Sequence, residues 1–250
     1  MTKEGLTPQL FAGSGHIHIE VSKLDPVTVR NFLVDFWNHT GLSAGALNDD
    51  VYNSIGIGEL PEKNKQSLRD IVNAFDAQSG ASIETLVNGI ESSVYDVSLN
   101  DELEEYRKSG RGTRPGKYHA ISFRSFFNQG TVEIRSLRPQ QNAASYRKML
   151  TLFVKRLEFA DAQAKQGIRV PVGAMPSLRG NPQEVLKNFH KYVSEVGLNI
   201  EDYKEFIMPW WQNAGGEWDQ FTGRLRFAKL PTNCSSMLSF ILNAKPPMNF

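Results

Sequence analysis

Residues 13–21 (Gly-Ser-Gly-His-Ile-His-Ile-Glu-Val) constrain the fold more than any other segment of this sequence. Two glycines indicate a turn, and polar and apolar residues then alternate, which is typical of a strand with one face in the core. His16, His18 and Glu20 share the polar face of this strand. Imidazoles and carboxylates bind divalent metals and exchange protons, so this face is a candidate functional site.

Helical patterns follow this strand. Asp25-Pro26 predicts a helix start, because Asp caps helices and Pro suits the first helical position. The spacing of later apolar residues predicts helices near 68–75, 83–90 and 143–166, another near 185–193 capped by Asn181-Pro182, and a short one after Asn199. The apolar stripe predicted for the long helix consists of Tyr146, Met149, Leu150, Phe153, Val154 and Leu157. Residues 40–62 have no clear period and are expected to form a loop.

Two more alternating segments, 118–123 and 131–136, flank the turn signal Asn128-Gln129-Gly130 and predict an antiparallel hairpin. Glu133 and Arg135 share the polar side of the second strand, and Arg124 falls on the polar side of the first. We expect the three strands to form one antiparallel sheet with helices packed on its apolar face. The polar face of such a sheet stays open.

The whole pattern predicts an α+β fold in two parts. Residues 1–167 form an α+β domain, and residues 168–250 form a helical C-terminal appendage and tail. The segment 101–117 carries many charges and three glycines, and we interpret it either as a solvated basic loop or as a lid that clamps phosphate. The aromatic tail lies either in the core or on a partner surface.

Composition narrows the choice of partners. The formal net charge is +1, which indicates neither a nucleic-acid nor a membrane partner. Cys234 is the only cysteine, so no intrachain disulfide forms, and a reducing, cytoplasmic compartment is expected. We find no signal-peptide pattern at the N-terminus and no apolar run long enough to cross a membrane.

The strand motifs resemble those of the glutamine synthetase-like carboxylate–amine ligases, in particular the amidoligase group found in bacteria and phages. Residues 13–18 are similar to the glycine-led His-x-His strand of these enzymes. Residues 118–122 and 131–135 resemble a later pair of strands, and residues 142–146 lead into a helix at the corresponding place. The resemblance covers roughly residues 12–160.

This resemblance implies a curved antiparallel sheet that binds ATP together with Mg²⁺ or Mn²⁺. A substrate carboxylate is phosphorylated to an acyl phosphate, and an amine then displaces the phosphate. By position, Glu133 and Arg135 match catalytic residues. The implied nucleotide- or phosphate-binding residues are Arg124, Arg135 and His16, and the implied metal ligands are His16, His18, Glu20 and Glu133.

The family also carries metal-binding glutamates on strands upstream of the His-x-His strand. Among the fifteen residues that precede His16, only Glu4 is acidic. We therefore expect a second polypeptide, or a second copy in a homo-oligomer, to supply the missing strands. The implied substrates are a small carboxylate and an amine, or a protein side chain.

Two other functions fit the sequence. One is a non-catalytic structural or assembly protein, for example a virion-associated protein of a phage, built on a degenerate amidoligase fold. The other is a metal-dependent DNA nickase in which His16 and His18 hold the metal and Tyr146 attacks DNA. The near-zero net charge argues against the nickase, as does the lack of any role in it for Glu133 and Arg135.

Overall fold

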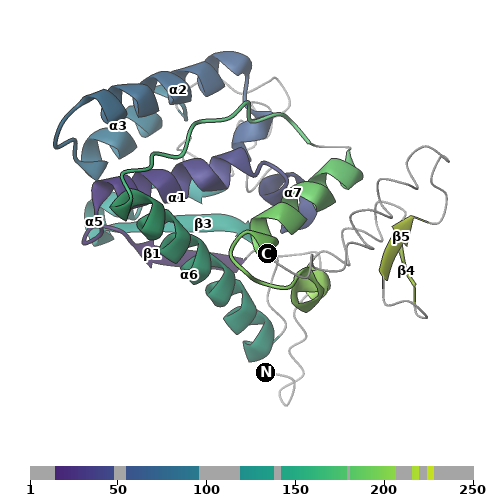
Figure 1. The fold of residues 1–250 in the computed structure, drawn as a ribbon. Helices are drawn as coiled ribbons and strands as arrows, with labels where there is room; N and C mark the ends of the chain where they lie inside the picture. Colours follow the sequence, from purple (N-terminus) through teal and green to yellow (C-terminus); the bar gives the residue numbers. More distant parts are fainter. Residues whose placement is uncertain are drawn as a thin grey trace.

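The fold is given by a computed structural model that describes residues 15–47, 55–95, 119–137, 142–178 and 181–206, and the backbone of 216–219 and 224–227. These residues form helices and a small antiparallel sheet (Figure 1), which confirms the predicted α+β class. The basic segment at 101–117 and residues 208–211 of the aromatic tail lie outside the described residues.

The sheet has the strand order β1-β3-β2, and both pairs are antiparallel. Its strands are β1 (Gly15–Glu20), β3 (Thr131–Leu137) and β2 (Ile121–Ser122). The predicted pairing is confirmed, but the predicted simple turn between β2 and β3 is wrong. A short helix, α5 (Phe126–Gln129), forms this connection and ends at Gly130, whose φ of 68° favours glycine.

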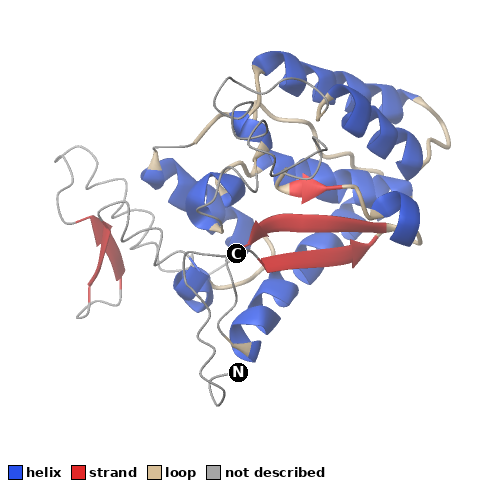
Figure 2. Ribbon diagram, turned by 180° about the vertical axis from the view of Figure 1, so that it is seen from behind, coloured by secondary structure: helices blue, strands red, loops and turns tan. Residues whose placement is uncertain are grey.

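Helix α1 (Pro26–Asn38) follows β1 directly, as predicted. The Asp25 carboxylate accepts a hydrogen bond from the Thr28 N–H at 3.0 Å, which caps the helix. Every residue from Thr28 to Trp37 is buried, so α1 lies inside the protein rather than on its surface. Figures 1 and 2, which view the fold from opposite sides, place α1 and α6 on the same side of the sheet.

Helix α6 (Ala143–Lys165) packs against α1 and begins at Asn142, which accepts a hydrogen bond from the Ser145 N–H. Its predicted apolar stripe is partly wrong, because Tyr146 is 44% exposed and Val154 is 52% exposed. Arg156 on the same helix is fully buried. The side of α6 that faces the core therefore differs from the predicted one and includes the charged residue Arg156.

Helices α2 (Glu62–Ala77) and α3 (Ile83–Ser93) confirm two further predictions. They pack against each other, and α3 also contacts α1. The region expected to be a loop, residues 40–62, contains a π-helical turn, η2 (Leu42–Ala46), and a 3-10 turn, η3 (Ile57–Glu59), and α2 begins at its end. In this region the apolar residues of the sequence have no regular spacing, so these turns were not predicted.

Residues 168–178 run as an extended strap along α1, a feature that the sequence does not indicate. Asn31 donates to the Ile168 carbonyl at 2.9 Å and accepts from the Val170 N–H at 3.0 Å. Two helical turns further on, Asn38 binds the Pro171 carbonyl and the Gly173 N–H in the same way. Each side-chain amide therefore pairs with the strap as a neighbouring strand would.

The chain then enters α7 (Pro182–Ser194), which Asn181 caps, and η6 (Ile200–Tyr203), which Asn199 caps. Both were predicted. Phe189 of α7 lies in the same hydrophobic core as Phe32 of α1 and Phe153 of α6, so this core extends across residue 167. A separate antiparallel pair, β4 (Gly216–Asp219) and β5 (Arg224–Phe227), follows.

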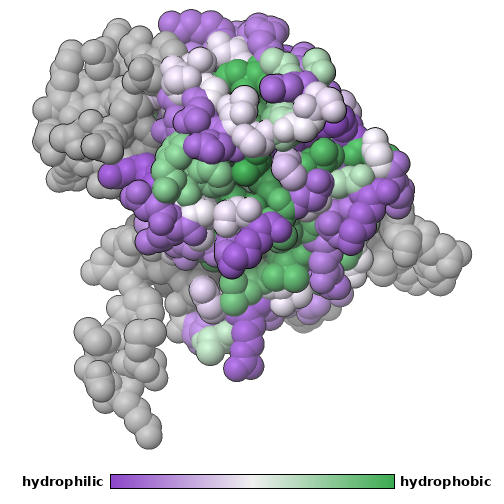
Figure 3. Space-filling view, turned by 90° about the vertical axis from the view of Figure 1, so that its left-hand side faces the viewer, coloured by the Kyte–Doolittle hydropathy of each residue, from purple (hydrophilic) through white to green (hydrophobic). Residues whose placement is uncertain are grey.

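Figure 3 shows one side of the molecule, where hydrophobic residues gather in a central region between hydrophilic ones. The most exposed large hydrophobic side chains belong to Phe127, Tyr146, Val154 and Ile168. Among the described residues, no helix is long and apolar enough to span a membrane.

Candidate functional site

The polar face of β1 is exposed, as predicted, but the expectation that the whole polar face of the sheet stays open is wrong, because Glu133 on β3 is 7% exposed and Ser122, its neighbour on β2, is fully buried. His16, His18 and Glu20 are exposed, whereas Ile17 between them is 4% exposed and belongs to the hydrophobic core. Val132 and Ile134 of β3 are buried in the same core. The three polar side chains of β1 therefore lie on the face of the sheet turned away from α1 and α6, the face toward the viewer in Figure 2.

Three of the predicted site residues make direct contact on this face, and we call them the sheet-face cluster: His16, Glu133 and Arg135. The Glu133 carboxylate oxygen Oε1 lies 2.8 Å from His16 Nδ1 and 2.7 Å from Arg135 Nη1. The antiparallel register makes this possible, since Glu133 pairs with His18, and His16, two residues before His18 on the same face, is the diagonal neighbour of Glu133. One carboxylate thus joins an imidazole to a guanidinium.

The surroundings of His16 favour its neutral form. Burial lowers the pKa of the imidazole, and the charge on Arg135 lowers it further, although Glu133 acts in the opposite direction. A neutral ring that donates Nδ1–H to Glu133 carries its lone pair on Nε2. That atom can then act as a metal ligand or a proton acceptor.

The remaining predicted residues occupy different places. His18 lies 3.3 Å from the Thr131 hydroxyl through Nδ1 and neighbours Glu133 across the strands. Glu20 forms an exposed ion pair with Lys23. Arg124 lies beyond the end of β2, where its charge lowers the pKa of Glu91 on α3, whereas burial of Glu91 raises it more. The structure therefore associates Arg124 with α3 rather than with the sheet-face cluster.

Tyr146, the nucleophile expected of a nickase, lies in the first turn of α6. Helix α6 covers one face of the sheet (Figure 2), and the alternation of buried and exposed residues in β1 directs His16 and His18 to the opposite face. A nickase needs its tyrosine and its metal ligands on one side of the DNA strand. The arrangement of these elements therefore argues against that function.

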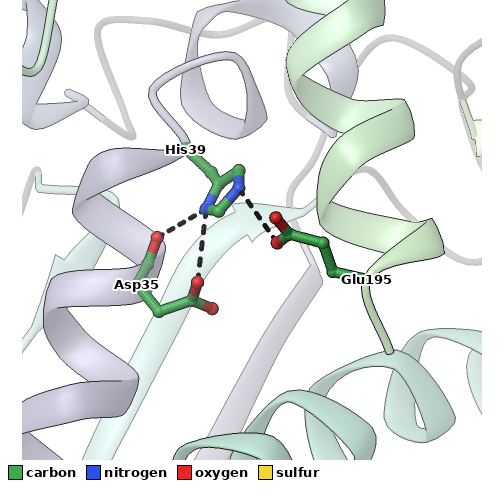
Figure 4. A group of neighbouring side chains, drawn as sticks. All are labelled: Asp35, His39 and Glu195. Atoms are coloured by element: carbon green, nitrogen blue, oxygen red, sulfur yellow. Dashed lines mark hydrogen bonds and ion pairs between the residues drawn. The ribbon is translucent and has the colours of Figure 1, made fainter. Parts of the chain in front are cut away.

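A second polar cluster, which the sequence analysis missed, lies where α1, α6 and α7 meet. We call it the helix-junction cluster: Asp35, His39, Arg156 and Glu195. Figure 4 shows His39 between the two carboxylates, with Nδ1 2.7 Å from the Asp35 backbone carbonyl and Nε2 3.8 Å from Glu195 Oε2. The spacing of Asp35 and His39, four residues apart on one helix, was the only available signal in the sequence.

Arg156 holds this cluster together from α6. Its guanidinium lies 3.3 Å from Asp35 Oδ1 and 3.2 Å from Glu195 Oε2, and it donates to the backbone carbonyl of Tyr192. The Tyr192 ring lies under the guanidinium carbon at 3.9 Å from the ring centre. The fully buried arginine is thus paired, hydrogen-bonded and stacked.

Burial shifts the titration of both acidic and basic members. It raises the pKa of Asp35 to about 6, although the charge on Arg156 opposes the shift. It lowers the pKa of His39 to about 4, although the hydrogen bond to the Asp35 carbonyl opposes that shift. His39 is therefore neutral at pH 7 and cannot contribute a charge to the pairing.

Asp35, His39 and Glu195 each place a ligand atom within 4.8 Å of the others, which is close enough to hold a metal ion. The guanidinium of Arg156 already contacts both carboxylates and supplies the positive charge that a cation would supply. A divalent cation at this place would be repelled by Arg156 and would compete with it. We therefore interpret the helix-junction cluster as a structural ion network.

The sheet-face cluster and its neighbours consequently form the candidate site that the geometry favours. A three-stranded antiparallel sheet with one polar face occurs in many unrelated folds, so it does not identify a family. No protein-family model matches this chain, and neither a curated protein nor a solved structure matches it.

Proposed function

We propose that this chain is an ATP-dependent carboxylate–amine ligase, or a subunit of one, whose site lies on the polar face of the sheet. The observation that supports this most is the contact of Glu133 with both His16 and Arg135 on that face. A carboxylate and an imidazole suit a divalent cation, and a guanidinium suits a phosphate.

In this proposal Glu133 and His16 bind the cation, with His18 and Glu20 as neighbours on β1. One carboxylate with imidazoles favours Mn²⁺ over Mg²⁺, because Mg²⁺ prefers a shell of oxygens. Arg135 neutralises the phosphoryl group as it passes from ATP to the substrate carboxylate. The products are ADP and an acyl phosphate, and an amine then attacks the acyl carbon, releases phosphate and loses a proton.

The substrates in this proposal are a small carboxylate and an amine, or a side chain of another protein. Arg124 lies near Glu91 rather than in the cluster, so it is proposed only as a secondary phosphate contact. The sheet-face cluster contains a single carboxylate, which is fewer than a site for ATP and its metal needs. We propose that a second polypeptide or a second copy contributes further carboxylates.

The test is nucleotide binding in the presence of Mn²⁺, measured by isothermal titration calorimetry on the full chain with any partner that co-purifies. We expect binding in the wild type and at least a tenfold loss of affinity in Glu133→Gln and in His16→Ala. Glu158→Gln, which changes an exposed carboxylate on α6, is the matched control and should bind as the wild type does. Equal affinity in all four proteins would refute the proposal.

The second candidate is a non-catalytic assembly protein. It is favoured by the pairing within the sheet-face cluster, because the same Glu133 oxygen already interacts with His16 and Arg135. Paired charges of this kind also stabilise purely structural proteins. This candidate predicts no nucleotide binding, together with a stoichiometric assembly that survives Glu133→Gln.

A further inference from the structure

Strand β1 forms the outer edge of the sheet. The order β1-β3-β2 leaves β1 with a single neighbour, whereas the far side of β2 is approached by Ile55, which bridges to His119. Among the described residues no strand pairs with the outer side of β1. An edge strand of this length presents backbone donors and acceptors that can pair with another chain.

The hydrogen bonds show which residues of β1 face outward. The Arg135 N–H donates to the Ala120 carbonyl, so Glu133 and Arg135 direct their backbone groups toward β2. Val132 and Ile134 therefore direct theirs toward β1, where they oppose Ile19 and Ile17. The Val21 N–H also donates inward, to Gly130. It follows that the backbone groups of His18 and Glu20, and of His16 in phase with them, point to the outer edge.

We propose that β1 pairs antiparallel with β1 of a second copy of this chain, about a two-fold axis that passes beside His18. Outward-facing residues must oppose outward-facing residues for hydrogen bonds to form, which restricts the centre to His16, His18 or Glu20. A centre at His18 gives the longest overlap, with about six hydrogen bonds between the two strands. This inference does not depend on the proposed ligase function.

The side chains fit this pairing. Each His16 lies opposite Glu20 of the partner subunit, and each His18 lies opposite its own counterpart, so no carboxylate opposes another. A parallel pairing in register would instead place the two Glu20 side chains together. Lys23, which pairs with Glu20, is 82% exposed. An ion pair this exposed contributes little free energy, so it does not prevent Glu20 from contacting a new partner.

The apolar side chains on the opposite face of the two β1 strands also fit this pairing. Ile17 lies opposite Ile19 of the partner subunit, and Ile19 is only partly buried within one copy. Pairing would cover more of this side chain, which favours association. The two sheets would then form one continuous sheet with both sheet-face clusters on the same polar face, separated by the two His18 side chains.

Disulfide trapping tests the register of this dimer. In a Cys234→Ser background, His18→Cys places two cysteines in a hydrogen-bonded pair, whose Cα atoms lie about 5.5 Å apart, a separation that a disulfide spans. Glu20→Cys is the matched control, because the two introduced cysteines would lie roughly 13 Å apart along the strands. We expect rapid dimer formation on mild oxidation in the first variant and at least tenfold slower formation in the second.

The oligomeric state provides an independent measurement. Light scattering after gel filtration should show a dimer for the wild-type chain and a monomer for Glu20→Pro, which removes an outward N–H while leaving the hydrogen bonds to β3. Glu20→Ala keeps that N–H and should stay largely dimeric, and circular dichroism checks that each variant folds. A monomeric wild type, or equal disulfide formation at positions 18 and 20, would overturn the inference, whatever the nucleotide-binding experiments show.

Discussion

The sheet-face cluster and the helix-junction cluster contain the same kinds of side chain in opposite surroundings. Each has one histidine, at least one carboxylate and one arginine. In the sheet-face cluster His16 is exposed and Arg135 is partly buried, whereas Glu133 is buried. In the helix-junction cluster Arg156 is fully buried, and Asp35 and His39 are almost fully buried.

This difference in burial determines what each cluster can do. A buried charge that loses its partner lowers the free energy of unfolding by several kcal/mol, so the stability of the fold depends on the helix-junction cluster. An exposed side chain exchanges its protein partner for water or a ligand at little cost. The exposed His16 of the sheet-face cluster can therefore change its contacts during a reaction, whereas the helix-junction cluster cannot do so without disturbing three helices.

The largest expected effect comes from Arg156→Met. This variant leaves Asp35 and Glu195 without their shared cation and removes a donor to the Tyr192 carbonyl. We expect a loss of about 3–5 kcal/mol in the free energy of unfolding, measured by urea titration. Arg135→Met in the sheet-face cluster should cost less, about 1–3 kcal/mol, because the buried Glu133 keeps its contact with His16.

Lys155→Met is the matched control for Arg156→Met, since it removes an exposed cation next to Arg156 on the same helix. Its free energy of unfolding should stay within about 0.5 kcal/mol of the wild type. If Arg156→Met does not fold, Arg156→Lys keeps the charge but loses the planar fork and should still be clearly destabilised. A wild-type stability for Arg156→Lys would contradict the view that this network stabilises the fold.

The next effect is on the pH dependence of stability. The pKa of His39 is lowered to about 4 from an ordinary value of 6.5. As the pH falls, the unfolded chain therefore binds a proton at this histidine at a higher pH than the folded chain does. That contribution to stability is present above pH 6.5 and is lost as the pH falls toward 4. The pKa of Asp35 is raised to about 6 from 3.8, so its contribution is present below pH 4 and is lost as the pH rises through 6.

The two contributions oppose each other in the wild type, and single variants separate them. Relative to the wild type, Asp35→Asn should lose stability as the pH falls from 6.5 to 4, because only the His39 contribution remains. His39→Asn should gain stability over the same range. Each slope is limited to about 1.4 kcal/mol per pH unit. Urea titrations at several pH values measure both slopes, and slopes of the same sign would contradict the assignment.

Local features of the fold could be predicted from the sequence because their causes lie within a few residues. The Asp25-Pro26 start of α1, the Asn142 and Asn181 caps and the alternation in β1 all have this property. The turn before β3 was predicted wrongly, because Phe126 and Phe127 begin a helical turn that Gly130 ends. Nothing in the pattern of turn residues distinguishes the two conformations.

The sites were predictable to different degrees for a similar reason. Pairing two alternating strands is enough to bring Glu133 close to the polar residues of β1. The burial of Arg156, in contrast, depends on α7 and on Glu195 at its C-terminal end, which is 39 residues further along the chain. The sequence around Arg156 is that of an ordinary amphipathic helix. Contacts between helices that are distant in sequence therefore decide which of its polar residues are buried.

The smallest expected change in stability is that of His18→Ala, which distinguishes a ligand-binding face from a structural one. His18 is exposed and makes one weak hydrogen bond, to Thr131 at 3.3 Å, so its removal should change the free energy of unfolding by less than about 0.5 kcal/mol. If the sheet face binds Mn²⁺, the same change should weaken that binding about tenfold, measured by electron paramagnetic resonance of the free ion. Lys23→Ala, which alters an exposed charge close to β1, should change neither quantity. A variant that keeps its stability but loses metal affinity would show that His18 is retained for binding, whereas unchanged affinity would restrict the metal site to His16 and Glu133.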